Sequence, residues 1–179
     1  MTLSAFSGLS DEAFTDSAWF SRSEEEQKES GPHMSRMTSP SPSQNEGAGL
    51  PHKSSCKDSL EVDLEQEEVV RYIQTNGCNG IDDFVKSYRL QYAQSDRQYH
   101  DFLESDGTPK IFEGNTSNNT LVQHSLGQLK ARYVRIVPVD FTGSNTLRWK
   151  LYIECKQLNT FCKKLSNSKV TMRFFFILM

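Results

Sequence analysis

Residues 21–59 contain very few apolar side chains. Those present are scattered among Ser, Glu, Pro and Gly: Met34, Met37, Ala48, Leu50 and Cys56. A segment this polar does not bury enough apolar surface to form a core of its own. We therefore expect it to be either a linker or a set of long loops that belong to a folded neighbour.

The chain also lacks a basic stripe, and its formal net charge is only −3. Proteins that neutralise a phosphate backbone carry clustered Lys and Arg, so nucleic acid is not an expected partner. Residues 1–20 lack the basic start and the continuous apolar run of a secretory signal. The apolar run at residues 174–179 is too short to span a bilayer. We expect residues 156–179 to be a disordered or spurious tail, unless they pack against the domain.

The four cysteines do not have the spacing of a metal site. Cys56, Cys78, Cys155 and Cys162 form no CxxC pair and have no neighbouring His pair, so we expect no metal. They are enough for two disulfides in an oxidising compartment, and the sequence leaves their pairing open. Each is interpreted as a structural or free thiol in preference to a catalytic one.

Catalytic motifs are missing as well. The four histidines lie in separate segments of the chain: His33, His52, His100 and His124. None adjoins a nucleophile elbow or a Gly-rich phosphate loop, and the pair Asp82-Asp83 is interpreted as a solvated turn. The sequence therefore predicts a protein that is not an enzyme and binds no cofactor.

What the chain does have is strict alternation of apolar and polar residues. In residues 146–155 one parity is apolar and the other polar, which predicts a half-buried strand. The apolar set is Leu147, Trp149, Leu151 and Ile153, and the polar set is Arg148, Lys150 and Tyr152. Residues 84–92 sort in the same way, with Phe84, Tyr88, Leu90 and Tyr92 on one parity.

Three further segments are strand candidates: residues 59–64, 69–75 and 131–139. Residues 110–116 are interpreted as a turn-bounded connection. Clusters of Gly, Asn, Asp and Pro separate the strands, and no helix of useful length is indicated. The sequence therefore predicts an all-β fold, either a sandwich or a jelly-roll barrel.

Four phrases carry a family resemblance: FVKSYRLQY, KIFEGNT, ARYVRIVPV and TLRWKLYIEC. In this order they resemble the discoidin family, also known as the C domain of coagulation factors five and eight. The resemblance covers residues 9–155, which we expect to form one discoidin-like domain. It implies an antiparallel barrel of jelly-roll type, whose loops at one end project as spikes that bind ligands.

The chain departs from the family pattern at several places, and Phe84 stands where the family commonly has Trp. Cys155 matches the second cysteine of the family's closing disulfide, but nothing before Cys56 matches the first. The dipeptide Leu50-Pro51 replaces a Trp that often follows the GAG phrase, which alters that loop. Glu65 stands where the family commonly has Gly, so we expect a strained or differently shaped turn there.

The first spike would carry Trp19 and Phe20. Neighbours on one strand face opposite ways, so both cannot enter the core. At least one is expected to be exposed or capped by the loop; alternatively, both pack under the loop and close the end of the barrel. Exposed aromatic rings stack on sugars or insert at membrane interfaces, and the family uses this spike in both ways.

The resemblance places a second spike at residues 49–53 and a third at residues 79–82. Together, the expected ligand-binding residues are Trp19, Phe20, Arg22, Leu50, His52, Lys53, Asn79 and Ile81. Glutamates offset the basic residues around these tips, which favours a glycan or protein ligand over an anionic membrane surface. The alternative is a peripheral module whose apolar tips insert into anionic phospholipid bilayers.

Asn115 and Asn118 each begin an N-x-[ST] sequon, which indicates a surface loop and glycosylation in a secreted protein. The family resemblance implies an extracellular or cell-surface adhesion module that recognises a cell-surface glycan or extracellular-matrix protein. Because no secretory signal is visible, we expect the N-terminus to be incomplete. A further hypothesis is that the chain is a truncated fragment of a multidomain receptor or matrix protein.

Overall fold

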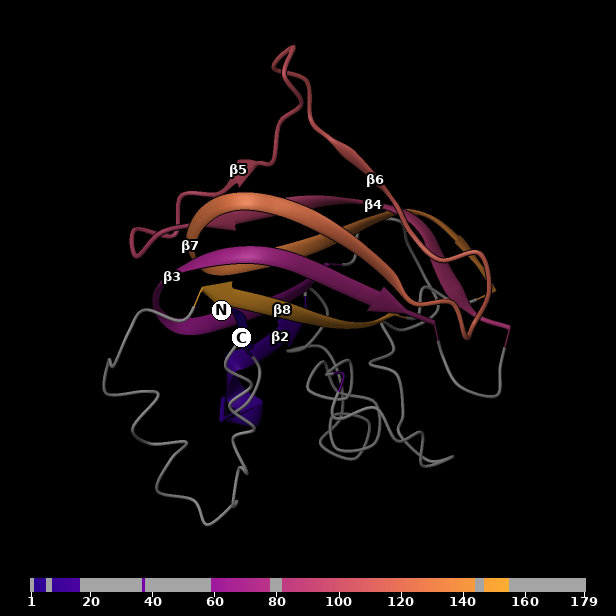
Figure 1. Ribbon diagram of the computed structural model, residues 1–179, viewed down its shortest axis with the longest axis horizontal. Coiled ribbons are helices and arrows are strands. Elements are labelled where there is room, and N and C mark those ends of the chain that lie inside the picture. The colour runs from indigo at the N-terminus through magenta and orange to yellow at the C-terminus, as the bar shows by residue number, and fades with distance from the viewer. Residues whose placement is uncertain are drawn as a thin grey trace, which may run out of the picture.

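The computed structural model describes residues 2–5, 8–16, 37, 59–77, 82–143 and 147–154 (Figure 1). The strands are β1 Thr2–Ser4, β2 Phe14–Asp16, β3 Leu60–Asn76, β4 Phe84–Ala93, β5 His100–Asp101, β6 Ile111–Glu113, β7 Val122–Thr142 and β8 Arg148–Glu154. Within these ranges, the helical structure is one 3₁₀ turn, Asp11–Ala13, and no helix is long and apolar enough to cross a membrane. The predicted all-β class is confirmed.

β3 and β7 are long strands that pair with each other twice, once in each layer of the barrel. Residues 60–63 of β3 pair with residues 133–136 of β7, and residues 68–75 pair with residues 122–131. All pairings are antiparallel, and the sheet order is β1-β8-β3-β7-β4-β5. In Figure 1 both ribbons curve strongly at the same side of the molecule.

The bend divides the sheet into two layers that face each other. One layer contains β1, β8, the later part of β3 and the early part of β7. The other contains β2, the early part of β3, the later part of β7 and β4, with β5 and β6 along its edge. This is the jelly-roll arrangement that the sequence predicts. β1 lies before the expected domain start at residue 9 and pairs with β8.

The bend in β3 is built around Glu65. Its φ of 66° is in the left-handed region, which costs a residue with a Cβ atom about 1 to 2 kcal/mol. The Glu65 amide donates to Asp63 Oδ1 at 2.7 Å, and Arg132 Nε donates to the same oxygen at 2.9 Å. Burial raises the pKa of Asp63, but these hydrogen bonds lower it by more, so the carboxylate stays ionised to hold the turn.

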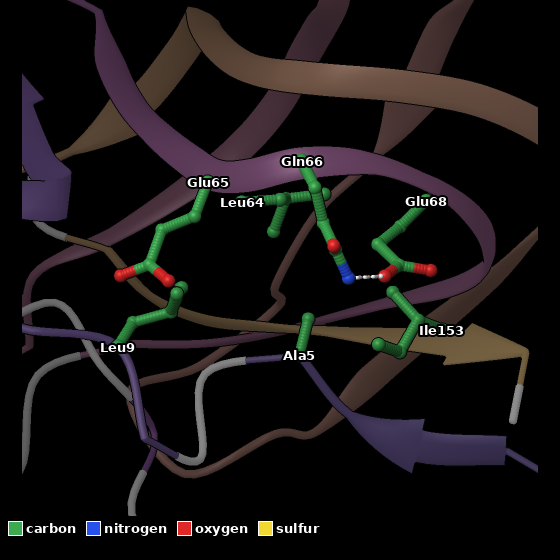
Figure 2. Close-up of a pocket in the computed structure, with 7 residues that line it drawn as sticks. All are labelled: Ala5, Leu9, Leu64, Glu65, Gln66, Glu68 and Ile153. Atoms are coloured by element: carbon green, nitrogen blue, oxygen red, sulfur yellow. Dashed lines mark hydrogen bonds between the residues drawn. The ribbon is translucent and has the colours of Figure 1, made fainter. Parts of the chain in front are cut away.

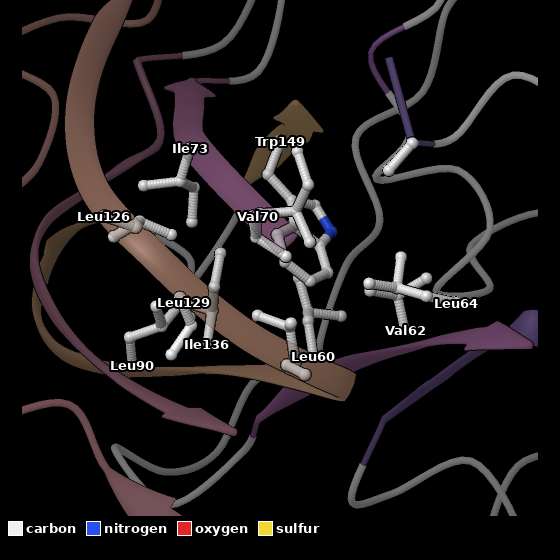
Figure 3. Close-up of a cluster of buried hydrophobic side chains, with 14 of the residues drawn as sticks. Leu60, Val62, Leu64, Val70, Ile73, Leu90, Leu126, Leu129, Ile136 and Trp149 are labelled. Atoms are coloured by element: carbon white, nitrogen blue, oxygen red, sulfur yellow. The ribbon is translucent and has the colours of Figure 1, made fainter. Parts of the chain in front are cut away.

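The core lies between the two layers and is filled by the inward parity of each strand. Figure 3 shows Leu60, Val70, Ile73, Leu90, Ile136 and Trp149 among its members. The apolar set predicted for β8, from Leu147 to Ile153, is buried throughout. The predicted inward parity of β4 is confirmed as well, because Phe84, Tyr88 and Leu90 are buried.

Arg148 corrects the predicted polar face of β8. Alternation placed it in solvent beside Lys150, but it is only 7% exposed, and its Nε donates to the Gly77 carbonyl at 2.8 Å. Arg148 is the first residue of β8 and lies opposite Asn76, the last residue of β3, so Gly77 directly follows its register partner. A loop from elsewhere in the chain thus overrides the alternation at the strand end.

Strand boundaries also differ from the sequence prediction. The two strands predicted at residues 59–64 and 69–75 are the continuous strand β3, and β7 begins nine residues before the predicted segment 131–139. The connection predicted at residues 110–116 contains the short strand β6. Irregularities in the β3–β7 register, with Gly127 at a φ of 66°, interrupt the period-two pattern.

The core prediction concerns the inward face of β8. Leu151 is completely buried, so Leu151→Ala should lower the free energy of unfolding by about 2 to 5 kcal/mol through loss of burial and formation of a cavity. Lys150→Ala on the opposite face is the matched control, with an expected change within about 0.5 kcal/mol. Urea denaturation followed by circular dichroism measures both. A larger loss for the lysine variant would reverse the assigned faces.

The bend makes a second prediction. Glu65→Gly should raise the free energy of unfolding by about 1 kcal/mol, because glycine adopts the left-handed conformation without a Cβ clash. Glu67→Gly in the same turn is the control and should not stabilise, since Glu67 has no positive φ to relieve. Equal effects of the two substitutions on the unfolding midpoint would rule out strain at Glu65.

Candidate functional site

Three connections and the six strand ends that they join meet at one end of the barrel. β3 ends at Asn76 opposite Arg148, where β8 starts, and β4 starts at Phe84 opposite Thr142, where β7 ends. Residues 77–83, 114–121 and 143–147 connect strands here. We call this region the loop-bearing end. Residues 16 and 60 are paired, so the segment between them also leaves and returns at neighbouring positions.

The connections at the loop-bearing end pack tightly against one another. A Cβ atom on Gly77 would lie 2.7 Å from Asn118 Cα, a distance that no side chain tolerates. A Cβ atom on Gly143 would lie 1.7 Å from Asp83 Oδ1, and the φ of Gly143 is 63°. The backbone contact therefore requires glycine at position 77, and the positive φ favours glycine at position 143. The close approach joins the connections after β3, β6 and β7 into one packed surface.

Asn115 anchors the connection between β6 and β7. Its side chain is 1% exposed, and its Nδ2 donates to the carbonyl of Thr75 at 3.2 Å and to the carbonyl of Thr120. Its amide donates to the Val85 carbonyl at 2.8 Å. A glycan would have to be attached to this same Nδ2, so glycosylation of Asn115 is incompatible with the folded domain, contrary to the sequon prediction. Asn118, the second predicted acceptor, is half-buried.

Exposed side chains at the loop-bearing end are mainly polar and carry no positive charge among the described residues. Those classed as exposed are Asp82, Thr116, Asn119, Leu121 and Gly143. Leu121 is the apolar member, at 53% exposure. Arg148 is turned inward to the Gly77 carbonyl, so it does not offer its charge to solvent. The described surface therefore presents amide, hydroxyl and carboxylate groups around one leucine.

The sequence profile of the F5/8 type C domain matches residues 21–154. The chain belongs to this family. The match spans β3 to β8, so it includes most strands of the barrel and every connection of the loop-bearing end. The family resemblance inferred from the four sequence phrases is confirmed.

Two curated relatives are similar in sequence, and one solved structure has the same fold. Lactadherin of Rattus norvegicus is 32% identical over 126 residues, which cover 67% of this chain and 28% of lactadherin. Hemocytin of Bombyx mori is 27% identical over 144 residues, covering 80% of this chain and 5% of hemocytin. Discoidin II of Dictyostelium discoideum has a TM-score of 0.69 at 20% identity, over 89% of this chain and 62% of its own. The chain thus spans a small part of these two relatives.

The ligand-binding residues expected in this F5/8 type C domain lie outside the described residues. They are Trp19, Phe20, Arg22, Leu50, His52, Lys53, Asn79 and Ile81. The segment that holds Asn79 and Ile81 starts after Gly77 and ends before Asp82, both at the loop-bearing end. The four cysteines and the segment 156–179 are likewise not described.

Sequence reasoning missed two residues at this end. The exposure of Leu121 could not be predicted, because a single leucine next to a strand is interpreted as the first residue of that strand. Asn115 does carry a signal, namely its position directly after the KIFEG phrase, but the sequon directed attention to glycosylation instead. Its structural role depends on contacts with Thr75, 40 residues earlier in the chain.

A pocket of about 250 Å³ lies at the opposite end of the barrel (Figure 2). Leu9, Leu64 and Ile153 supply apolar walls, and Glu65 and Glu68 add carboxylates on the bend of β3. Ser95, just after β4 ends, bonds Glu67 of the same bend, which places the pocket away from the loop-bearing end. Within the described ranges, no group of three or more His, Cys, Asp and Glu side chains is arranged to hold a metal ion.

Asn115 yields a prediction about the stability of the loop-bearing end. Asn115→Asp should lower the free energy of unfolding by about 2 kcal/mol or more, because a carboxylate there cannot donate to the Thr75 carbonyl and is buried. Asn119→Asp in the same loop is exposed and should stay within about 0.5 kcal/mol. Chemical denaturation at neutral pH compares the two. Equal stabilities would show that Asn115 is not an anchor.

Proposed function

We propose that this F5/8 type C domain is an extracellular ligand-binding module for adhesion. It recognises a cell-surface glycan or an extracellular-matrix protein through its loop-bearing end. Its action is recognition without catalysis. The predicted spike residues, from Trp19 to Ile81, supply contacts together with the described residues Thr116, Asn119 and Leu121. Asn118 remains a proposed glycan acceptor, because it is partly exposed to solvent, unlike Asn115, and begins an N-x-[ST] sequon.

The observation that carries this proposal is the convergence of connections on one packed end of a rigid barrel. Binding residues are commonly found on loops that a rigid scaffold positions. Here Gly77 and Gly143 let three connections approach closely, and Asn115 fixes one of them to β3 and β4. Such an end holds recognition groups in place before the ligand arrives, which lowers the entropy lost on binding.

The chemistry of the exposed groups supports a neutral polar ligand. Sugars and protein surfaces are bound by a few hydrogen-bonding groups around apolar contacts. Thr116 and Asn119 provide hydroxyl and amide groups, and Leu121 provides apolar area. The family supplies the general role of a binding domain, and these residues narrow the chemical class of the ligand.

The second candidate is a peripheral module that binds anionic phospholipid. It is supported by the apolar residues at the predicted spikes: Trp19, Phe20, Leu50 and Ile81. Each basic residue near a charged membrane contributes about 1 kcal/mol. The described part of the loop-bearing end presents Asp82 and no exposed cation, which favours the first proposal.

Two substitutions of equally exposed leucines test the proposed surface. Leu121 lies at the loop-bearing end at 53% exposure, and Leu103 lies on the hairpin between β5 and β6 at 52%. Leu121→Ala should weaken ligand binding several-fold, while Leu103→Ala should leave it unchanged. The double variant Trp19→Ala/Phe20→Ala should weaken binding by about tenfold or more, because exposed aromatics dominate such contacts.

Glycan arrays and immobilised matrix proteins provide the ligands, and thermal unfolding verifies that each variant is folded. Vesicles of phosphatidylcholine with and without phosphatidylserine test the second candidate. Binding that requires phosphatidylserine would replace the proposal with the membrane function. Equal binding by the Leu121 and Leu103 variants, with the aromatic variant also unaffected, would place the ligand site away from the loop-bearing end.

A further inference from the structure

The outer face of β8, β3 and β7 carries a group of polar and aromatic side chains that the proposed function does not use. Tyr72 lies between Tyr152 and Ser125 in the strand register, and Gln74 lies between Lys150 and Gln123. Their neighbours Ile73 and Leu151 are buried, so these residues project outward. We call Tyr72, Tyr152, Gln74, Gln123 and Lys150 the outer platform. Residues 72 and 152 become neighbours only through the pairing of β3 with β8.

Hydrogen bonds connect the outer platform in a series, with each residue donating to the next from β8 across β3 to β7. The Tyr152 hydroxyl donates to Gln74 Oε1 at 2.9 Å, and Gln74 Nε2 donates to Gln123 Oε1 at 2.6 Å. Both polar atoms of the Gln74 amide are therefore used inside the platform. This series of hydrogen bonds ends at Gln123, whose Nε2 is a donor. A ligand that meets this end must accept hydrogen bonds.

Charge on the same face is of one prevailing sign. Among the described residues of this face, the cations are Arg71, Lys130 and Lys150. Glu154 is the one carboxylate among the same residues, and its Oε2 lies 3.0 Å from Arg71 Nη2. The Lys150 ammonium lies 5.5 Å from the centre of the Tyr152 ring and forms no ion pair in the described part of the chain. A cation–π contact thus holds the ammonium over Tyr152, which is the register partner of Tyr72.

The outer face of the other layer shows the opposite pattern. There Arg135 pairs with Glu61 at 2.8 Å, Arg132 with Asp63 at 2.9 Å, and Lys86 with Asp140 at 3.1 Å. Each of these three cations is paired with a carboxylate of the domain. The outer platform is set apart because Lys150 keeps its charge available to a partner.

We infer that the outer platform is a second binding site, for an anionic oligosaccharide. A pyranose ring lies against the Tyr72 side chain, which is 36% exposed, and its carboxylate or sulfate group accepts from the Lys150 ammonium and from Gln123 Nε2. Tyrosine suits this role because its ring offers apolar area and its hydroxyl remains wet. Charge complementarity selects an acidic sugar over a neutral one. The inference does not depend on the loop-bearing end, so the two proposed sites can be tested independently.

The test uses the whole chain and three probes of similar length: a heparin oligosaccharide, a hyaluronan oligosaccharide and an uncharged chito-oligosaccharide. Heparin carries sulfates in addition to the carboxylates found in hyaluronan, so the first two probes separate the sources of negative charge. Isothermal titration calorimetry at low and high salt measures affinity. Binding of at least one acidic probe, weakened by salt, and no matching affinity for the uncharged probe are expected.

Three variants test the individual contacts. Lys150→Gln should lower the affinity by about tenfold and reduce its salt dependence, because a hydrogen bond to a charged group is lost. Gln123→Glu keeps the acceptor for Gln74 but replaces the free donor with a carboxylate, and should weaken binding as strongly. Tyr72→Thr removes the ring in favour of another strand-forming residue and should weaken binding about threefold to tenfold.

Lys86→Gln is the matched control, since it removes one cation from the opposite layer, where Asp140 already pairs with it. Thermal unfolding verifies folding, and if Tyr72→Thr is unstable, Lys150→Gln and Gln123→Glu decide the question. Trp19→Ala/Phe20→Ala should bind the acidic probe normally, which separates this site from the loop-bearing end. The inference is overturned if no acidic probe binds, if Lys86→Gln has the same effect as Lys150→Gln, or if the chito-oligosaccharide binds the Trp19→Ala/Phe20→Ala variant as tightly as the acidic probes do.

Discussion

The shared bend of β3 and β7 is the constraint on which the rest of the domain depends. Because each of these strands passes from one layer to the other, one continuous sheet encloses its own core. The bend requires a residue in the left-handed region, and Glu65 occupies that position with its amide bonded to Asp63. The Asp63–Arg132 ion pair then ties the turn back to β7. The free-energy cost of strain at one residue is small compared with the stabilisation from the apolar area that the two layers bury between them.

Much of the fold was predictable, because the alternation of apolar and polar residues shows directly which side chains of a strand face the core. In β8 and the residue before it, the apolar side chains from Leu147 to Ile153 are buried as expected. Prediction failed where a contact distant in sequence overrides the alternation, as at Arg148, whose partner Gly77 is 71 residues away. It also failed where irregular register breaks the period, as in β3 around Glu65 and in β7 around Gly127. The strained turn at Glu65 was anticipated, because the family resemblance marked that position for glycine.

The candidate sites were less predictable than the fold, for a physical reason. The loop residues expected from the family resemblance lie outside the described residues, so those predictions stay predictions. The Asn115 sequon is a three-residue pattern, and such a pattern contains nothing about burial. The outer platform gives no sequence signal at all, because Tyr72 and Tyr152 are 80 positions apart and meet only through the β3–β8 register. A surface formed by residues of several strands can be recognised only when the pairing register of those strands is known.

The two surfaces would bind by different energetic routes. The outer platform is rigid, since its backbone lies in paired strands and Gln74 fixes both of its side-chain neighbours through hydrogen bonds. Little conformational entropy is lost there on binding, but a sheet face encloses less of a sugar than a cleft does, so each contact is weak. A repeating acidic polymer offsets this weakness, because neighbouring sugars rebind at high effective concentration. The loop-bearing end has the reverse properties, with side chains from several connections that can surround one ligand group. A long acidic chain therefore suits the sheet face, whereas a compact terminal group suits the loops.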